Sequence, residues 1–130
     1  MLKGNTLPDG RAVKSLQRAI LELSELEQVT VGVEPLEPAL QRIVGIIEEN
    51  PDSLDAIKRE FIELVRACPP GTTEIVQFCM HRYRWEEVRR ELERLIGASN
   101  DVRSLTVYRQ ALEAFDSNWG DRDIFTAYRP

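Results

Sequence analysis

The stretch NPDSLDAIKREFIELVRACPPG, residues 50–71, holds the start, the apolar face and the end of one helix. Asn50 is a typical helix cap, and Pro51 suits the first helical turn, where a missing backbone N–H does no harm. Apolar residues then recur every three or four positions, the spacing that places them on one side of a helix. The run CPPG at residues 68–71 ends the helix, because proline cannot continue it. The inward positions are Leu54, Ile57, Phe61, Leu64 and Val65.

Two helices are predicted upstream of this stretch. Residues 1–9 form a loose lead, after which Asp9 can cap the first helix, and Pro35 and Pro38 suit the first turn of the second. The intervening run VTVGV at residues 29–33 is strand-like. A single short strand has nothing to pair with, so we expect a loop packed on the core. The two apolar stripes consist of Val13, Leu16, Ile20, Leu23 and Leu26, and of Leu36, Leu40, Ile43, Val44 and Ile47.

Three further helices are predicted downstream. Thr72 can cap the fourth helix, and Asp101 can cap the sixth after a turn at residues 97–100. We expect a break near residues 83–84, because two glutamates then precede several arginines, the order that a helix dipole favours. The inward residues of the three helices are Ile75, Val76, Cys79 and Met80; Trp85, Val88, Leu92 and Leu95; and Val102, Leu105, Tyr108, Leu112 and Phe115.

The last stretch, residues 116–130, shows no regular period but carries too much apolar area for a free tail. We expect it to fold back, with Trp119 packed beside the helix at residues 102–115 and Asp116 or Asp121 capping the turn. Its apolar residues are Trp119, Ile124, Phe125 and Tyr128.

The whole pattern predicts one all-α domain over residues 1–130, a compact bundle or array of five to six helices with an irregular, packed C-terminal segment. The 130 residues are 42% apolar and 30% charged, which is typical of globular chains. No apolar run approaches the roughly 20 residues of a membrane helix. With two cysteines and no signal peptide, we expect a reduced, cytoplasmic setting and no membrane association.

The formal charge of −5 comes from the first half of the chain. Residues 1–65 hold 7 basic and 12 acidic side chains, whereas residues 66–130 hold 10 of each. Net acidity argues against nucleic acid as a partner, since phosphate contacts need clustered cations. It favours another protein, of basic character, bound through an acidic face. The residues predicted to form this face are Glu22, Glu25, Glu27, Glu34, Glu37, Glu48 and Glu49.

The segment from His81 to Arg90 offers an alternative binding patch. It interleaves cations with aromatic rings, a pattern that suits RNA through stacking and charge. Glutamates lie among its arginines at helical pairing distances, which favours a solvated helix paired with itself over a protein-contact face, and either over RNA binding. The residues of this patch are His81, Arg82, Arg84, Arg89 and Arg90.

Catalytic and metal-binding motifs are not recognisable. Cys68, Cys79 and His81 supply three soft ligands, one fewer than a structural zinc site takes. Residues 116–127 resemble a calcium loop in composition, but Gly120 and Ala127 break the required pattern. There is no glycine-rich phosphate loop, nucleophile elbow or metalloprotease helix. We therefore expect no cofactor and no metal.

These observations favour a non-enzymatic protein–protein interaction domain, of an immunity-like or antitoxin-like kind or an adaptor or regulatory subunit. One alternative is a small helical enzyme whose site is assembled from scattered residues. A second is an RNA-binding module that uses residues 81–90. The sequence leaves the identity of the partner, the functional face and the oligomeric state open.

Overall fold

The computed structural model describes the backbone of residues 3–130 and the side chains of residues 9–130. This part of the chain contains α-helices and short 3-10 turns and no β-strand, which confirms the predicted fold class. The α-helices are α1 (Lys3–Glu27), α2 (Glu37–Glu49), α3 (Leu54–Ala67), α4 (Thr72–Tyr83), α5 (Glu86–Ala98) and α6 (Val102–Glu113). The 3-10 turns are η1 (Glu34–Leu36), η2 (Pro51–Ser53), η3 (Arg122–Ile124) and η4 (Thr126–Tyr128).

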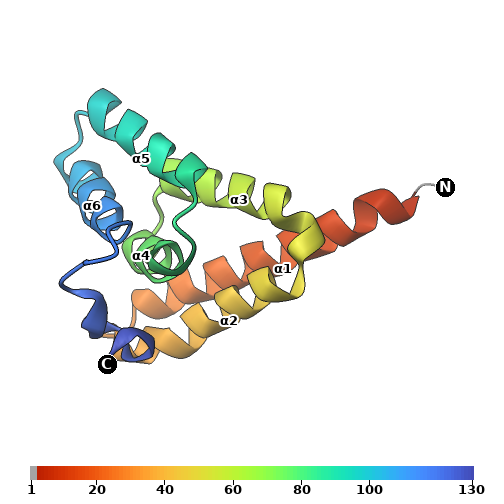
Figure 1. Cartoon of the computed structure of the whole chain (residues 1–130), viewed down its shortest axis with the longest axis horizontal. Coiled ribbons are helices and arrows are strands. Elements are labelled where there is room, and N and C mark those ends of the chain that lie inside the picture. The colour runs from red at the N-terminus through yellow and green to blue at the C-terminus, as the bar shows by residue number, and fades with distance from the viewer. Residues whose placement is uncertain (1–2) are drawn as a thin grey trace.

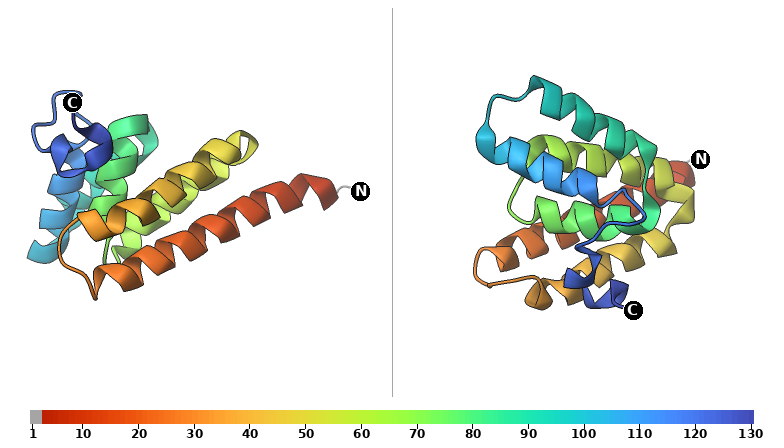
Figure 2. Two further views of the ribbon diagram at one scale, coloured as in Figure 1. Left: turned by 90° about the horizontal axis from the view of Figure 1, so that it is seen from below. Right: turned by 60° about the vertical axis from the view of Figure 1, so that its left-hand side comes forward.

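Each helix packs against the helix two places along the chain, and α1 with α2 and α5 with α6 pack as chain neighbours, with α4 near the centre (Figure 1). α1 is the longest helix and lies along α2 and α3 (Figure 2). α5 packs on α3, and α6 closes the other side by packing on both α5 and α4. The C-terminal segment then crosses back from the end of α6 towards α2 (Figure 2).

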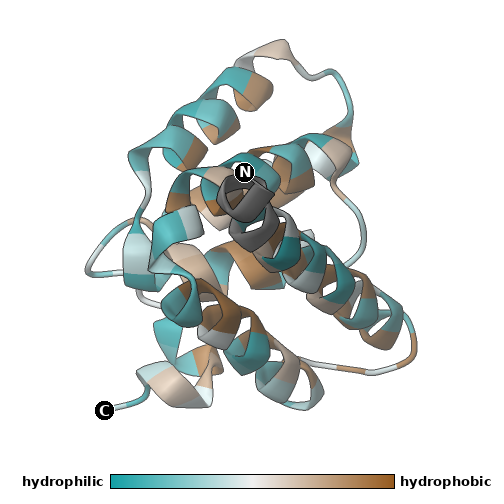
Figure 3. Ribbon diagram, turned by 90° about the vertical axis from the view of Figure 1, so that its right-hand side faces the viewer, coloured by the Kyte–Doolittle hydropathy of each residue, from teal (hydrophilic) through white to brown (hydrophobic). Residues whose placement is uncertain are grey.

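One apolar core runs through all six helices. The apolar faces turn towards the interior and the polar faces turn outward (Figure 3). Phe61 of α3 meets Trp85 edge to face, with ring centroids 5.2 Å apart, and Phe78 of α4 meets Phe125 of the C-terminal segment at 5.0 Å. The core therefore links the helices to the segment after residue 116, whose folding back is confirmed by the burial of Trp119 and Phe125.

The start of α1 differs from the prediction. The helix begins at Lys3, so residues 3–9 are helical and Asp9 lies within α1 instead of capping it. The predicted loose lead covered residues 1–9, of which residues 1 and 2 lie outside the described part of the chain. Pro8 is the sixth residue of α1 and removes one backbone hydrogen bond there, but the helix continues past it, and Ala12 and Leu16 of the following turns are buried.

The loop after α1 also differs from the prediction. Residues 29–33 form no strand, as expected, but Val29 and Val31 are 80% and 94% exposed and do not pack on the core. Only Val33 of this run packs against it. Gly32, with φ +82°, helps turn the chain here, so the loop reverses direction without pressing its first two valines inward.

Two predicted caps are wrong in detail. The amide of Asn50 donates back to the Ile46 carbonyl at 2.7 Å, so it closes the end of α2 and does not cap α3. α4 is preceded by Gly71, and the Thr72 hydroxyl donates to the Pro69 carbonyl. Asp101, by contrast, caps α6 as predicted by accepting from the Ser104 N–H.

Gly71 permits the close approach of α1 to the start of α4. Its φ is +90°, and a Cβ built there would lie 2.6 Å from Cδ2 of Leu23. Both the backbone conformation and the available space therefore require glycine. This contact fixes the end of α1 beside the first turn of α4.

Within residues 3–130, no helix has the length and apolar character needed to cross a membrane.

Candidate functional site

The seven glutamates of the predicted acidic face come from α1, η1 and α2. Glu37 and Glu49 are the first and last residues of α2, about 18 Å apart along the helix axis. Three of the seven have partners within the molecule. Glu22 pairs with Arg42, Glu48 accepts from the Tyr83 hydroxyl, and Glu37 accepts the N–H groups of Thr126 and Ala127, each at 2.8 Å. The other four are Glu25, Glu27, Glu34 and Glu49.

The alternative patch is largely engaged in intramolecular contacts. The Arg89 guanidinium pairs with two glutamates of α5, Glu86 and Glu93, and Arg90 pairs with Glu86 at 3.4 Å. Arg82 lies 3.7 Å from Glu48 of α2.

His81 also makes a contact within the molecule, whereas Arg84 differs from the other residues of the patch. The His81 ring nitrogen Nδ1 lies 3.0 Å from the Ala114 carbonyl, which only a protonated Nδ1 can satisfy. Arg84 has an exposed side chain and forms no ion pair with the described residues. Most cations of this segment are therefore paired with acids of the same molecule, as the sequence predicts.

Glu91 of α5 forms the most enclosed ion-pair cluster. Its side chain is only 9% exposed and accepts hydrogen bonds from Arg66 of α3 at 2.8 Å and from Arg94 at 2.6 Å. These two guanidinium groups, Arg94 foremost, lower the pKa of Glu91 to about 2. The cluster joins α3 to α5. Because the carboxylate and both guanidinium groups are already paired with one another, it offers little to a ligand.

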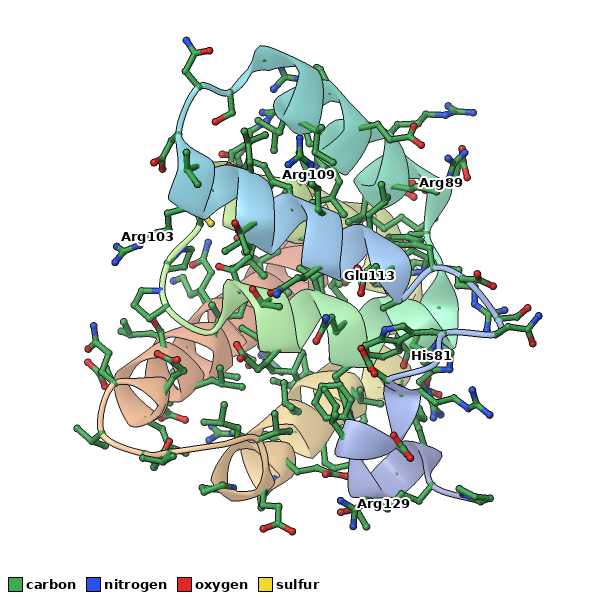
Figure 4. All side chains as sticks on the ribbon, turned by 90° about the vertical axis from the view of Figure 1, so that its left-hand side faces the viewer. His81, Arg89, Arg103, Arg109, Glu113 and Arg129 are labelled. Carbon is green, nitrogen blue, oxygen red and sulfur yellow. The ribbon has the colours of Figure 1, made fainter. Side chains whose placement is uncertain are left out.

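A different region, between α4 and α6, brings together several carboxylates that form no ion pair with the described residues and one buried donor without an acceptor. Three surface hollows of about 420, 240 and 510 Å³ share lining residues, the first two through Thr73 and Glu74 and the last two through Glu113, Trp119 and Asp121. Together they make one run, which we call the α4–α6 groove. Figure 4 looks onto this face, with Arg103 near one end of α6 and Glu113 towards the other.

Carboxylates outnumber cations along the α4–α6 groove. The end of α1, the first turn of α4, the end of α6 and the turn after it all contribute acids, whereas the cations come from α6 alone. The acids that line the groove are Glu27, Glu74, Glu113, Asp116 and Asp121, and the bases are Arg103 and Arg109.

Two of these carboxylates occupy unfavourable positions. Burial, followed by the nearby charge of Glu27, raises the pKa of Glu74 above its ordinary value. Glu113 is the last residue of α6, where the negative end of the helix dipole disfavours a second negative charge. Neither side chain forms an ion pair within residues 9–130. A cation placed between them would relieve both costs.

Trp119 lines two of the three hollows. Its side chain is 4% exposed and packs against His81, with centroids 5.4 Å apart. Its indole nitrogen Nε1 is buried without a hydrogen-bond acceptor among the described residues. A donor enclosed in this way costs roughly 1–3 kcal/mol, so nearly all buried indoles find an acceptor. Trp119 therefore carries an unpaired N–H donor and lines a groove in which carboxylates outnumber cations.

Cys68 lies at the other end of the groove and is poorly suited to nucleophilic chemistry. Burial, with a smaller contribution from Asp101, raises the pKa of its thiol. A thiol whose pKa is raised is mostly protonated at neutral pH, and the thiolate is the reactive form. Its φ of 52° reflects its position as the residue that ends α3. Cys79 is fully buried in the core, as its position on an apolar stripe predicts.

Within the described residues, no three His, Cys, Asp or Glu side chains lie close enough together to hold a metal ion. Asp116, one of the residues of the calcium-like run, instead accepts from the Asn118 N–H at 2.9 Å, which is the turn-capping role predicted for it.

Sequence reasoning identified only part of this groove. Glu27 was included in the acidic face and Trp119 was placed beside α6, but Glu74, Glu113 and Asp121 were not assigned to a common site. These residues come from segments up to 94 positions apart, Glu27 and Asp121, and no local spacing connects them. No protein-family model, curated protein or solved structure matches the chain.

Proposed function

We propose that this protein is a non-enzymatic interaction domain that binds a basic, extended segment of a partner protein in the α4–α6 groove. The observation that carries the proposal is the buried Trp119 N–H, which lacks an acceptor where several carboxylates line the surface. A peptide can supply both missing groups, a main-chain carbonyl for the indole and a Lys or Arg side chain for the acids.

An extended partner segment fits better than a helix. Inside a helix the main-chain carbonyls are already hydrogen-bonded, whereas an extended chain presents them to its surroundings. The indole N–H is enclosed, so the carbonyl reaches it only after a local shift of the turn at residues 116–121. Binding then recovers the free energy that the unpaired donor costs the unbound protein.

The charge of the groove supports a basic partner. Glu74 and Glu113 are unfavourably placed in the unbound protein, by burial and by the end of the α6 dipole respectively, and an arginine between them forms charge-assisted hydrogen bonds that offset both costs. Such a partner matches an adaptor, a regulatory subunit or an inhibitor of a basic protein. RNA binding through residues 81–90 has less support, because most of the cations of that segment are paired within the molecule.

A matched pair of triple variants tests the proposal. The probe is a short synthetic peptide in which arginine alternates with serine, and the readout is its affinity by titration calorimetry. Glu74→Gln, Glu113→Gln and Asp121→Asn together should weaken binding roughly tenfold, since each lost charge pair is worth roughly 0.2–1 kcal/mol and three together roughly 0.6–3 kcal/mol.

The control variant carries the same loss of charge elsewhere. Glu34→Gln, Glu49→Gln and Asp52→Asn alter exposed acids outside the groove, and this variant should bind within about threefold of the unmodified protein. A peptide with glutamine in place of arginine should not bind. Equal weakening in both triple variants would mean nonspecific charge attraction and would overturn the assignment of the groove.

A further inference from the structure

The outward face of α1 carries an ordered stripe of charged residues around one leucine. The spacing of three and four residues places Arg11, Lys14, Arg18, Leu21 and Glu25 in line along the helix. All five are exposed, and Leu21 is 59% exposed. The opposite face, with Leu16 and Leu23, is buried in the core. The stripe is therefore available to a partner along its whole length.

The order of charges along this stripe is the reverse of what a single helix prefers. Bases lie in the N-terminal part and acids near the C-terminal end, and α1 has no basic residue in its last turn. The helix dipole favours acids first and bases last. The dipole acts within the terminal turns, so Glu25 and Glu27 in the last turn are unfavourably placed in a lone α1. An antiparallel neighbour that brings a base to this end compensates the cost.

We infer that two copies of this protein associate through α1, packed antiparallel about a twofold axis near residues 19 and 20. Antiparallel helices with this spacing pair four of the five stripe positions with complementary positions of the other helix. In this register Lys14 lies opposite Glu25 of the second copy, and the aliphatic stem of Arg18 covers Leu21 of the second copy. Each contact occurs twice, as twofold symmetry requires.

Neighbouring features of the surface suit the same partner. Leu21 lines an apolar hollow of about 250 Å³ between α1 and α3, whose charged lining residues, Glu60 and Glu63, are both acids. The second copy brings its basic N-terminal part of α1 to the acidic end of the first. Charge complementarity therefore holds for a second copy of the chain and sets the antiparallel orientation.

Charge exchange provides the test, with the dissociation constant of the dimer measured by sedimentation equilibrium. Lys14→Glu and Glu25→Lys should each weaken the dimer roughly tenfold or more, because each creates two repulsive pairs in place of two attractive ones. The double variant restores opposite charges in exchanged positions and should recover most of the affinity.

Leu21→Lys should also weaken the dimer, whereas Val102→Lys on α6, where the valine is 77% exposed, should not. Circular dichroism of each variant checks that the helices are intact. A protein that stays monomeric at all accessible concentrations overturns the inference. A dimer whose double variant is as weak as the single variants overturns it as well. Peptide binding in the α4–α6 groove is independent of either result.

Discussion

At the scale of single residues, Trp119 makes two opposing contributions to the stability of the folded protein. Its ring fills space between α4, α6 and the C-terminal segment, and its N–H has no acceptor. Trp119→Ala should lower the free energy of unfolding by roughly 3–5 kcal/mol, the usual range for losing a buried large aromatic side chain. Trp119→Phe should lower it by about 1 kcal/mol or less, since removal of the unpaired donor offsets the lost volume.

Chemical denaturation of both Trp119 variants measures these differences. The two variants separate packing from hydrogen bonding, because only the phenylalanine variant keeps most of the ring. If Trp119→Phe were as destabilising as Trp119→Ala, the indole N–H would have to be hydrogen-bonded in the unbound protein. The main support for a missing acceptor would then be lost.

Glu91 makes the stability of the folded protein depend on pH. Its pKa is about 2 in the folded protein against an ordinary value of 4.5, so the folded state binds its proton more weakly than the unfolded state. The stabilisation is complete above about pH 4.5 and is lost as the pH falls towards 2. Glu91→Gln should cost roughly 1–2 kcal/mol at pH 7, because Arg66 and Arg94 lose their shared acceptor.

Urea denaturation across this pH range tests the role of Glu91. The difference in stability between the unmodified protein and Glu91→Gln should shrink as the pH falls from about 4.5 to about 2. A constant difference would show that Glu91 contributes through packing and not through its charge. Glu93→Gln serves as the control, since Glu93 is exposed and pairs only with Arg89 of its own helix among the described residues.

At the scale of secondary-structure elements, two helices end at residues that are not glycine yet adopt the left-handed conformation. Cys68 ends α3 with φ 52°, and Arg84 ends α4 with φ 50°. Side chains with a Cβ are strained there. Arg84→Gly should therefore raise the free energy of unfolding by roughly 0.5–1 kcal/mol, while Arg84→Ala, which keeps the Cβ, should not.

Thermal denaturation distinguishes these variants of Arg84. A higher melting temperature for glycine alone assigns the gain to backbone strain. A similar gain for alanine would instead assign it to removal of the exposed guanidinium. The position matters for the fold, because this left-handed residue makes the sharp turn that separates α4 from α5.

The existence of each helix could be predicted from the sequence, but several helix ends could not. Stripes such as Leu40 to Ile47 and Ile57 to Val65 are buried as their spacing requires. Predicted caps were wrong where the side chain makes another local hydrogen bond, with a carbonyl three or four residues earlier. Asn50 closes α2 instead of opening α3, and Val102, although in register with its stripe, lies beyond the edge of the core and is 77% exposed.

At the scale of the whole molecule, the fold was more predictable than the site. Burial of apolar stripes depends on spacing within one helix, which a sequence displays directly. The α4–α6 groove depends on how distant helices meet, and its acids look like ordinary surface residues in the sequence. Charge counts likewise do not reveal that Glu37, one residue of the predicted acidic face, holds the C-terminal segment through Thr126 and Ala127.

The most direct test of the groove is the indole N–H resonance of Trp119 during titration with the arginine–serine peptide, observed by two-dimensional NMR. The chain has two tryptophans, and Trp85→Phe assigns the two signals. Trp85 packs against Phe61 and Tyr83 between α3 and α4, so it serves as an internal reference. We predict that the Trp119 signal shifts downfield as its N–H gains a carbonyl acceptor, while the Trp85 signal stays in place. An unmoved Trp119 resonance at saturating peptide would contradict the account.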